Sequence, residues 1–150
     1  MYVSRVDTDE LVALWVFDES TPEEWDAHLR DLATYIASFK GSGRRGASLI
    51  IARDFSRPAT RHRAELTRLT DLPEFDPFVA FVNPNAALRA VLAMFGWMQK
   101  APRYEIDFFG SSGAGLAWLE KKRGMKLNKL TSFHEEVVAE YRQKQGRDLP

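Results

Sequence analysis

Along this chain, short runs of consecutive apolar residues alternate with longer segments whose apolar residues recur every three or four positions. A continuous apolar run bounded by turn residues is typical of a strand buried within a sheet, and the wider spacing is typical of an amphipathic helix. The sequence therefore predicts strands over residues 2–6, 11–17, 47–52, 78–82 and 104–109. It predicts helices over residues 22–40, 60–70, 86–100 and 114–122.

The first of these helices has the most explicit boundary signals. Thr21 is placed to be its N-cap, Pro22 suits the first helical position, and Glu24 can complete a capping box with Thr21. We expect His28 to lie at the boundary between the buried face and solvent. The buried face is expected to carry Trp25, Leu29, Leu32, Ile36 and Phe39.

The predicted elements follow one another in the order β-β-α-β-α-β-α-β-α. Strands that alternate with helices form a mostly parallel sheet with helical crossovers, and the turn at residues 7–9 makes the first two strands an antiparallel hairpin. The predicted fold class is therefore α/β, with a single mixed β-sheet of about five strands and helices packed on it.

Residues 124–150 extend beyond this pattern, so we divide the chain into an α/β domain over residues 1–123 and a C-terminal helical extension over 124–150. Ser132 can cap a further helix, with Glu135 completing its capping box. The apolar stripe of this helix has to be covered, either by its own domain or by a second subunit in a homodimer. The stripe is formed by Leu130, Phe133, Val137, Val138 and Tyr141.

Length and composition limit the size of the core and the cellular compartment that we expect for the protein. A chain of 150 residues is long enough to bury one hydrophobic core. It has no cysteine, which excludes disulfides and thiolate metal sites and suits a reducing cytoplasm. The first residues lack the regions of a signal peptide, and the apolar runs are too short to cross a bilayer. We therefore expect a cytoplasmic protein without a membrane span.

The formal net charge is zero, but the charges are segregated along the chain. Acidic residues dominate residues 1–31, whereas arginines dominate residues 44–68. This asymmetry can steer a charged partner toward the protein, or the two segments can lie side by side and neutralise each other. Because the net charge is zero and no basic strand is interleaved with aromatic residues, nucleic acid is not an expected partner.

Polar residues follow the strand at 47–52, and arginines surround the start of the helix at 60–70. A helix N-terminus favours anions, and ligands of open α/β sheets bind where parallel strands end. The alternatives are a solvated basic face, and a turn in which Asp54 or Ser56 bonds to local backbone. The glycine-rich loop at 110–115 resembles a phosphate loop only loosely, and a plain turn accounts for it. The candidate ligand-binding or anion-binding residues are Arg53, Asp54, Ser56, Arg57, Thr60 and Arg61.

The helix over residues 86–100 is apolar over a wider arc than one sheet face covers, and Trp97 lies beyond that arc beside small residues. We expect it to pack against the stripe of the C-terminal helix, within one chain or between two. The alternative is that Trp97 packs beneath a connecting segment of its own domain. The candidate partner interface consists of Met94, Trp97, Met98, Phe133, Val137 and Tyr141.

No motif identifies a metal, a cofactor or a catalytic mechanism. His28, His62 and His134 are far apart in the sequence and form no metal-binding pair. Ser56, His62 and Asp54 have the residue types of a catalytic triad, but the Gly-x-Ser-x-Gly nucleophile elbow that would support one is absent around Ser56.

The order of the elements and three segments carry a family resemblance. The segments are GASLIIARDFS at residues 46–56, FVAFVNPN at 78–85 and YEIDFFGSSGAGLAWLEKKRG at 104–124. They resemble the STAS family of anti-sigma-factor antagonist-like domains, in particular the bacterial branch grouped with CRAL-TRIO lipid-binding domains. The resemblance covers roughly residues 1–123, and the last segment is similar to the closing strand–helix unit of the family.

The resemblance implies a non-catalytic regulatory or scaffolding module that binds a protein partner, such as a kinase, through a loop and a helix N-terminus. The matching region here carries Arg57-Pro58-Ala59-Thr60 where the family usually carries Asp-Ser-Ser-Gly. The lipid-binding relatives imply the alternative, a carrier of a small apolar ligand or lipid in an internal cavity. An enzyme of unknown class is the third hypothesis, and neither a cofactor nor a metal is expected.

Overall fold

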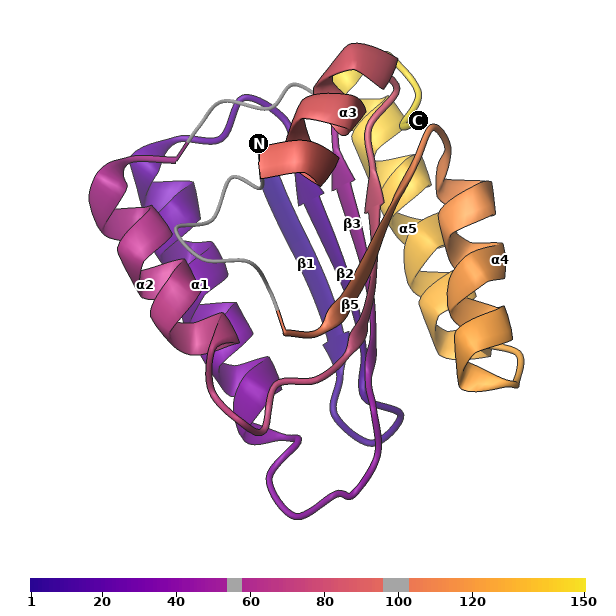
Figure 1. The fold of residues 1–150 in the computed structure, drawn as a ribbon. Coiled ribbons are helices and arrows are strands. Elements are labelled where there is room, and N and C mark those ends of the chain that lie inside the picture. The colour runs from indigo at the N-terminus through magenta and orange to yellow at the C-terminus, as the bar shows by residue number, and fades with distance from the viewer. Residues whose placement is uncertain (54–57, 96–102) are drawn as a thin grey trace.

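The computed structural model describes residues 1–53, 58–95 and 103–150, and for residues 91–95 it describes the backbone only. One five-stranded sheet runs through the described part, with the strands in sequence order from one edge to the other (Figure 1). Its strands are β1 (Tyr2–Asp7), β2 (Val12–Phe17), β3 (Ala47–Ala52), β4 (Phe78–Val82) and β5 (Glu105–Phe109). The helices are α1 (Pro22–Ala37), α2 (Thr60–Thr70), α3 (Ala86–Phe95), α4 (Ser112–Arg123) and α5 (Asn128–Gln145).

The pairing of the strands confirms the predicted fold class. β1 and β2 form an antiparallel hairpin, and the remaining neighbours are parallel. The register aligns Val16 with Ile51 and Ile51 with Val82, so side chains at these positions point to the same face of the sheet. The protein is therefore an α/β domain with a single mixed sheet.

Helices cover both faces of the sheet (Figure 1). On one face, α1 and α2 pack over a core that includes Trp15, Phe17 and Phe81, with Leu88 of α3 packed against the same cluster. On the other face, α4 and α5 bury the alternate side chains of the same strands in a second cluster. Every residue of β2 and β4 is buried, because both faces of these strands are covered.

The signals at the start of α1 act as predicted. The Thr21 side chain accepts a hydrogen bond from the backbone of Glu24, and the Glu24 side chain accepts one from the backbone of Thr21. The helix ends at Ala37, three residues before the predicted end, with Ser38 as its C-cap. The prediction for His28 is wrong: its side chain is 4 % exposed and belongs to the buried face.

α4 packs unusually close to the sheet because Gly115 faces it. A Cβ added at Gly115 would lie 3.2 Å from side-chain atoms of Leu49 and Val82. Ser111 caps the start of α4, and Gly124 ends it in the left-handed conformation, with a φ of 66°. A glycine at residue 115 therefore lets the helix backbone approach the central strands.

The C-terminal helix begins earlier than its capping signal predicted. α5 starts at Asn128, and Ser132 lies inside the helix, where its hydroxyl donates to Glu136 at 3.1 Å. The preceding residue, Leu127, is buried in the core and anchors this start instead. The start of α5 is thus set by burial of the Leu127 side chain, and not by a polar cap at Ser132 as the sequence predicted.

The apolar stripe of α5 is covered by its own chain. Leu130, Phe133 and Val137 pack in the cluster beneath α4 and α5, and Tyr141 is fully buried. The structure therefore shows the first of the two expected arrangements, in which the stripe packs on its own domain and not on a second subunit. Among the described helices, none is both long enough and apolar enough to cross a membrane.

We expect Leu130→Ala to reduce the free energy of unfolding by about 2–5 kcal/mol, because a fully buried leucine is replaced by a cavity. The matched control is Met125→Ala, since Met125 is 54 % exposed and its replacement should change stability by less than about 0.5 kcal/mol. Urea denaturation at two protein concentrations measures both effects. Equal losses for the two variants, or a loss for Leu130→Ala that depends on concentration, would contradict packing of α5 within one chain.

Candidate functional site

The structure does not gather the predicted anion-binding residues at one place. The guanidinium of Arg53 donates to the backbone carbonyl of Asp148, which follows α5 in the chain. Arg61 instead forms an ion pair with Asp26 of α1 at 3.0 Å, and Thr60 accepts a hydrogen bond from Arg63 at 3.3 Å. Asp54, Ser56 and Arg57, the other members of the predicted set, lie outside the described residues.

The contact between Asp26 and the start of α2 joins the acidic and basic segments of the chain. Asp26 accepts from Arg61, and its other oxygen lies 3.0 Å from Nε2 of the buried His62. The hydrogen bond from Arg61 holds the pKa of Asp26 below its usual value. Part of the charge segregation is therefore neutralised between α1 and α2. His62 pairs with Asp26, whereas the triad considered from sequence paired it with Asp54 and Ser56.

The residues of the predicted partner interface lie on different layers. Phe133, Val137 and Tyr141 are core residues of their own chain, so α5 presents no apolar stripe for a partner. Met94 lies on α3, and α3 packs over the opposite face of the sheet (Figure 1). Trp97 and Met98 lie outside the described residues.

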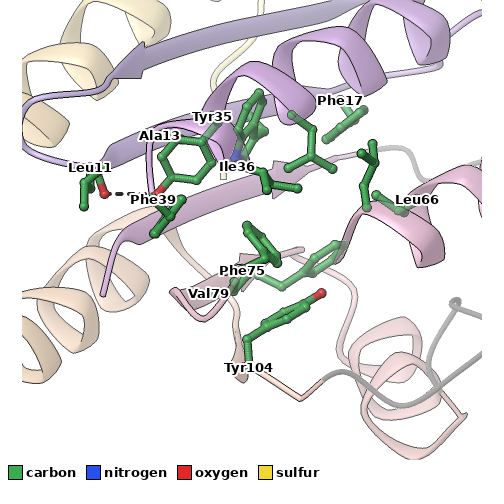
Figure 2. Close-up of a cluster of buried hydrophobic side chains, with 14 of the residues drawn as sticks. Leu11, Ala13, Phe17, Tyr35, Ile36, Phe39, Leu66, Phe75, Val79 and Tyr104 are labelled. Carbon is green, nitrogen blue, oxygen red and sulfur yellow. Dashed lines mark hydrogen bonds between the residues drawn. The ribbon is translucent and has the colours of Figure 1, made fainter. Parts of the chain in front are cut away.

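An apolar cavity lies between the sheet and the layer of α1 and α2. The sequence analysis expected such a cavity only under its alternative hypothesis, a carrier of a small apolar ligand. Its volume is about 40 Å³. Figure 2 shows part of its wall, with Phe75, Val79 and Tyr104 on one side and Leu66 on the other. The rings of Phe75 and Tyr104 meet edge to face with centroids 5.1 Å apart. The described lining residues are Trp15, Phe17, Trp25, His28, Leu32, Ser48, Ile50, Leu66, Thr70, Phe75, Val79, Phe81 and Tyr104.

His28 is the titratable imidazole in this wall, and aromatic rings surround it. Its ring meets those of Phe17 and Trp15 edge to face, with centroid distances of 4.8 and 5.1 Å. Its Nδ1 lies 3.4 Å from the hydroxyl of Tyr2. Burial lowers the pKa of His28 to about 3, so the imidazole is neutral at physiological pH. The histidine therefore contributes a polar but uncharged edge to the cavity.

The hydroxyl groups of Thr70 and Ser48 in the lining have partners within the fold. Thr70 donates to the carbonyl of Leu66 at 2.9 Å, and Ser48 donates to the hydroxyl of Tyr35 at 3.4 Å. No lysine, arginine, aspartate or glutamate is among the described lining residues. Because an unpaired charge would be costly in such a space, the cavity suits a neutral apolar group.

A second concave feature lies on the surface between α1 and α2. Its volume is about 300 Å³, and it is more open to solvent than the cavity. The floor is formed by small and aliphatic side chains, and charged side chains form the rim. The floor residues are Ala33, Ile36, Ala37, Leu69 and Leu72, and the rim residues are Lys40, Arg68 and Glu74.

The sequence contained a partial signal for the cavity. Trp15 and Phe17 are two residues apart on β2 and so point to one face, and Trp25, His28 and Leu32 follow at helical spacing on α1. This pattern shows that aromatic side chains converge between a strand and a helix. It does not show how completely they fill the space, which depends on the distance between the two layers.

We expect the free energy of unfolding of the wild type to fall as the pH drops from about 6.5 toward 3, by up to about 1.4 kcal/mol per pH unit from His28 alone. The unfolded chain takes up a proton near the ordinary pKa of 6.5, whereas folded His28 stays neutral until about pH 3. His28→Gln should remove this part of the pH dependence. Urea denaturation between pH 7 and pH 4 is the measurement.

His134→Gln is the matched control, since His134 is only partly buried and its pKa is lowered less by burial. The free energy of unfolding of His134→Gln should depend on pH almost as steeply as that of the wild type. An unchanged slope in His28→Gln would show that His28 is not held neutral in the core.

Among the described residues, no cluster of three or more His, Asp or Glu side chains could hold a metal ion. No family model matches the chain, and neither a curated protein nor a solved structure matches it significantly. The resemblance to STAS domains consequently stays a prediction that rests on the three sequence segments. What the chain binds has to be inferred from the cavity and the groove of this structure.

Proposed function

We propose that this protein is a non-catalytic binding module that takes a small, neutral, apolar ligand into the cavity between the sheet and the layer of α1 and α2. The observation that carries the proposal is the mostly apolar lining, rich in aromatic rings, with no charged residue among its described members. Ligand sites of this kind are mostly apolar, with a few polar groups that fix orientation. The polar groups of the lining are the His28 imidazole and the hydroxyls of Ser48 and Thr70, whose protons are donated within the fold and whose oxygens can still accept a hydrogen bond.

The size of the cavity limits what enters it. At about 40 Å³ it is smaller than an engineered cavity of about 150 Å³ that binds benzene or xenon. A compact group, such as a short alkyl chain, is therefore the part of the ligand that the cavity accepts. A larger ligand requires an outward movement of the wall formed by α2, in a state that the ligand itself stabilises.

A protein-binding regulatory module of the STAS type is the second candidate function. The groove between α1 and α2 favours it, because its floor is apolar and its rim is charged, as at many protein interfaces. Both candidate functions are compatible with a cytoplasmic location, because a chain without cysteine suits a reducing compartment.

The cavity is tested by filling it. Val79→Ile adds one methylene to the lining and should weaken the binding of apolar probes, because the space for them is reduced. The probes are xenon, which is smaller than benzene, and 1-hexanol, which carries an alkyl chain, and binding is read as a rise in melting temperature with probe concentration. The fluorescence of Trp15 and Trp25, which both line the cavity, gives a second measurement.

Two variants serve as controls. Val16→Ile adds the same methylene to a buried valine that faces the other layer of helices, so probe binding should persist. Ala37→Arg fills the surface groove and should also leave probe binding intact. The proposal fails if neither probe stabilises the wild type, or if Val79→Ile binds the probes as well as Val16→Ile does. Loss of probe binding in Ala37→Arg alone would move the site to the groove.

A further inference from the structure

The imidazole of His28 has one nitrogen in a chain of hydrogen bonds and the other nitrogen without a partner. Its Nδ1 lies 3.4 Å from the hydroxyl oxygen of Tyr2, and that hydroxyl donates to the Asp31 carboxylate at 2.9 Å. None of the described residues forms a hydrogen bond with Nε2 of His28. Because the His28 side chain is nearly fully buried, a polar atom left unpaired on it requires an explanation.

The same chain of hydrogen bonds determines which nitrogen of His28 carries the proton. Burial raises the pKa of Tyr2, so the hydroxyl keeps its proton and donates it to the hydrogen bond with Asp31. A hydroxyl has a single proton, so the Tyr2 oxygen can only accept from His28. The neutral imidazole therefore has its proton on Nδ1 and a bare lone pair on Nε2.

Nε2 belongs to the part of the imidazole ring that lines the apolar cavity. The two ring nitrogens form their hydrogen bonds in directions that point apart. Tyr2, the partner of Nδ1, is not among the described lining residues, whereas His28 is one of them. The edge of the ring that carries Nδ1 thus faces away from the cavity, and we assign to the cavity the edge that carries Nε2.

A bare acceptor in an apolar wall discriminates between ligands. A ligand without a donor displaces water from the cavity and leaves Nε2 unpaired, which is costly in a buried place. A ligand with a hydroxyl group supplies the missing O–H donor. The hydroxyls of Ser48 and Thr70 donate within the fold, so they too can only accept from a ligand. A site built from acceptors rejects an analogue that lacks the donor.

We propose that the ligand of the cavity is a neutral alcohol, with a short alkyl group in the apolar space and a hydroxyl that donates to Nε2 of His28. This inference rests on the proposed function, because it requires that the cavity takes up a ligand. His28 is the residue that determines specificity. Tyr2 and Asp31 are positioning residues, which act by keeping the imidazole proton on Nδ1.

The experiment compares two isomeric probes, 1-butanol and methyl propyl ether. Both have an unbranched chain and one oxygen, but only the alcohol donates a hydrogen bond. Affinities are read from the rise in melting temperature with probe concentration. We expect the wild type to bind 1-butanol at least about tenfold more tightly than the ether, because the ether leaves Nε2 unpaired.

His28→Leu removes the acceptor and should bind the two probes about equally. The matched control is Thr70→Val, which has nearly the same shape as the wild-type residue, removes a different acceptor of the lining and should keep the preference for the alcohol. Equal affinities of the wild type for the two probes would overturn the proposal. A preference that survives in His28→Leu and is lost in Thr70→Val would overturn it as well.

Nitrogen NMR of the His28 imidazole tests the proton position directly and does not require His28→Leu to fold. In the wild type, Nδ1 should be protonated and Nε2 unprotonated, and 1-butanol should shift the Nε2 resonance whereas the ether should not. Tyr2→Phe removes the acceptor of the Nδ1 proton, so part of the proton should move to Nε2 and the preference for the alcohol should fall. The matched control is Ser4→Ala, which removes another donor to Asp31 and should leave the proton on Nδ1. Protonation of Nε2 in the wild type would overturn the proposal.

Failure of this proposal differs from failure of the proposed function. If both isomers bind equally and Val79→Ile weakens both, the cavity takes up ligands but does not select alcohols. If neither isomer nor xenon stabilises the wild type, the cavity takes up no ligand and both proposals fail.

Discussion

The structure depends on one constraint, which is that the central strands are apolar on both faces. β2 and β4 bury every residue, and β3 buries all but Ile50, so no face of these strands can be left to water. Two layers of helices are therefore required, and without α5 the part of the second cluster that Leu130, Phe133 and Val137 cover would be exposed. This requirement explains why α5 packs on β1 and β2 and belongs to the core of the domain.

The two layers meet the sheet in different ways. On the side of α4, Gly115 allows the helix backbone to come close to Leu49 and Val82, so that no room is left there for a larger side chain. On the side of α1 and α2, large rings such as those of Trp15 and Trp25 line the cavity. The cavity therefore lies in the layer that is rich in aromatic side chains, where we propose that a ligand binds.

Asp18 connects distant parts of the chain at the carboxyl edge. Its side chain binds Tyr141 and Arg147, and its carbonyl accepts from the N-terminal ammonium of Met1. A carboxylate this deeply buried is stable only with such partners, so the position of residue 147 is coupled to the packing of α5.

The sequence by itself determined the elements and the fold class. Periodicity of apolar residues located each strand and the described helices, and the capping box at Thr21 fixed the start of α1, because these signals act between residues close in the chain. Only the tertiary structure decided that α5 starts at Asn128, that His28 is buried, that His62 pairs with Asp26 and that a cavity exists. Each of these features depends on contacts between segments far apart in sequence, and local patterns cannot specify which side chains will meet or how closely they will pack.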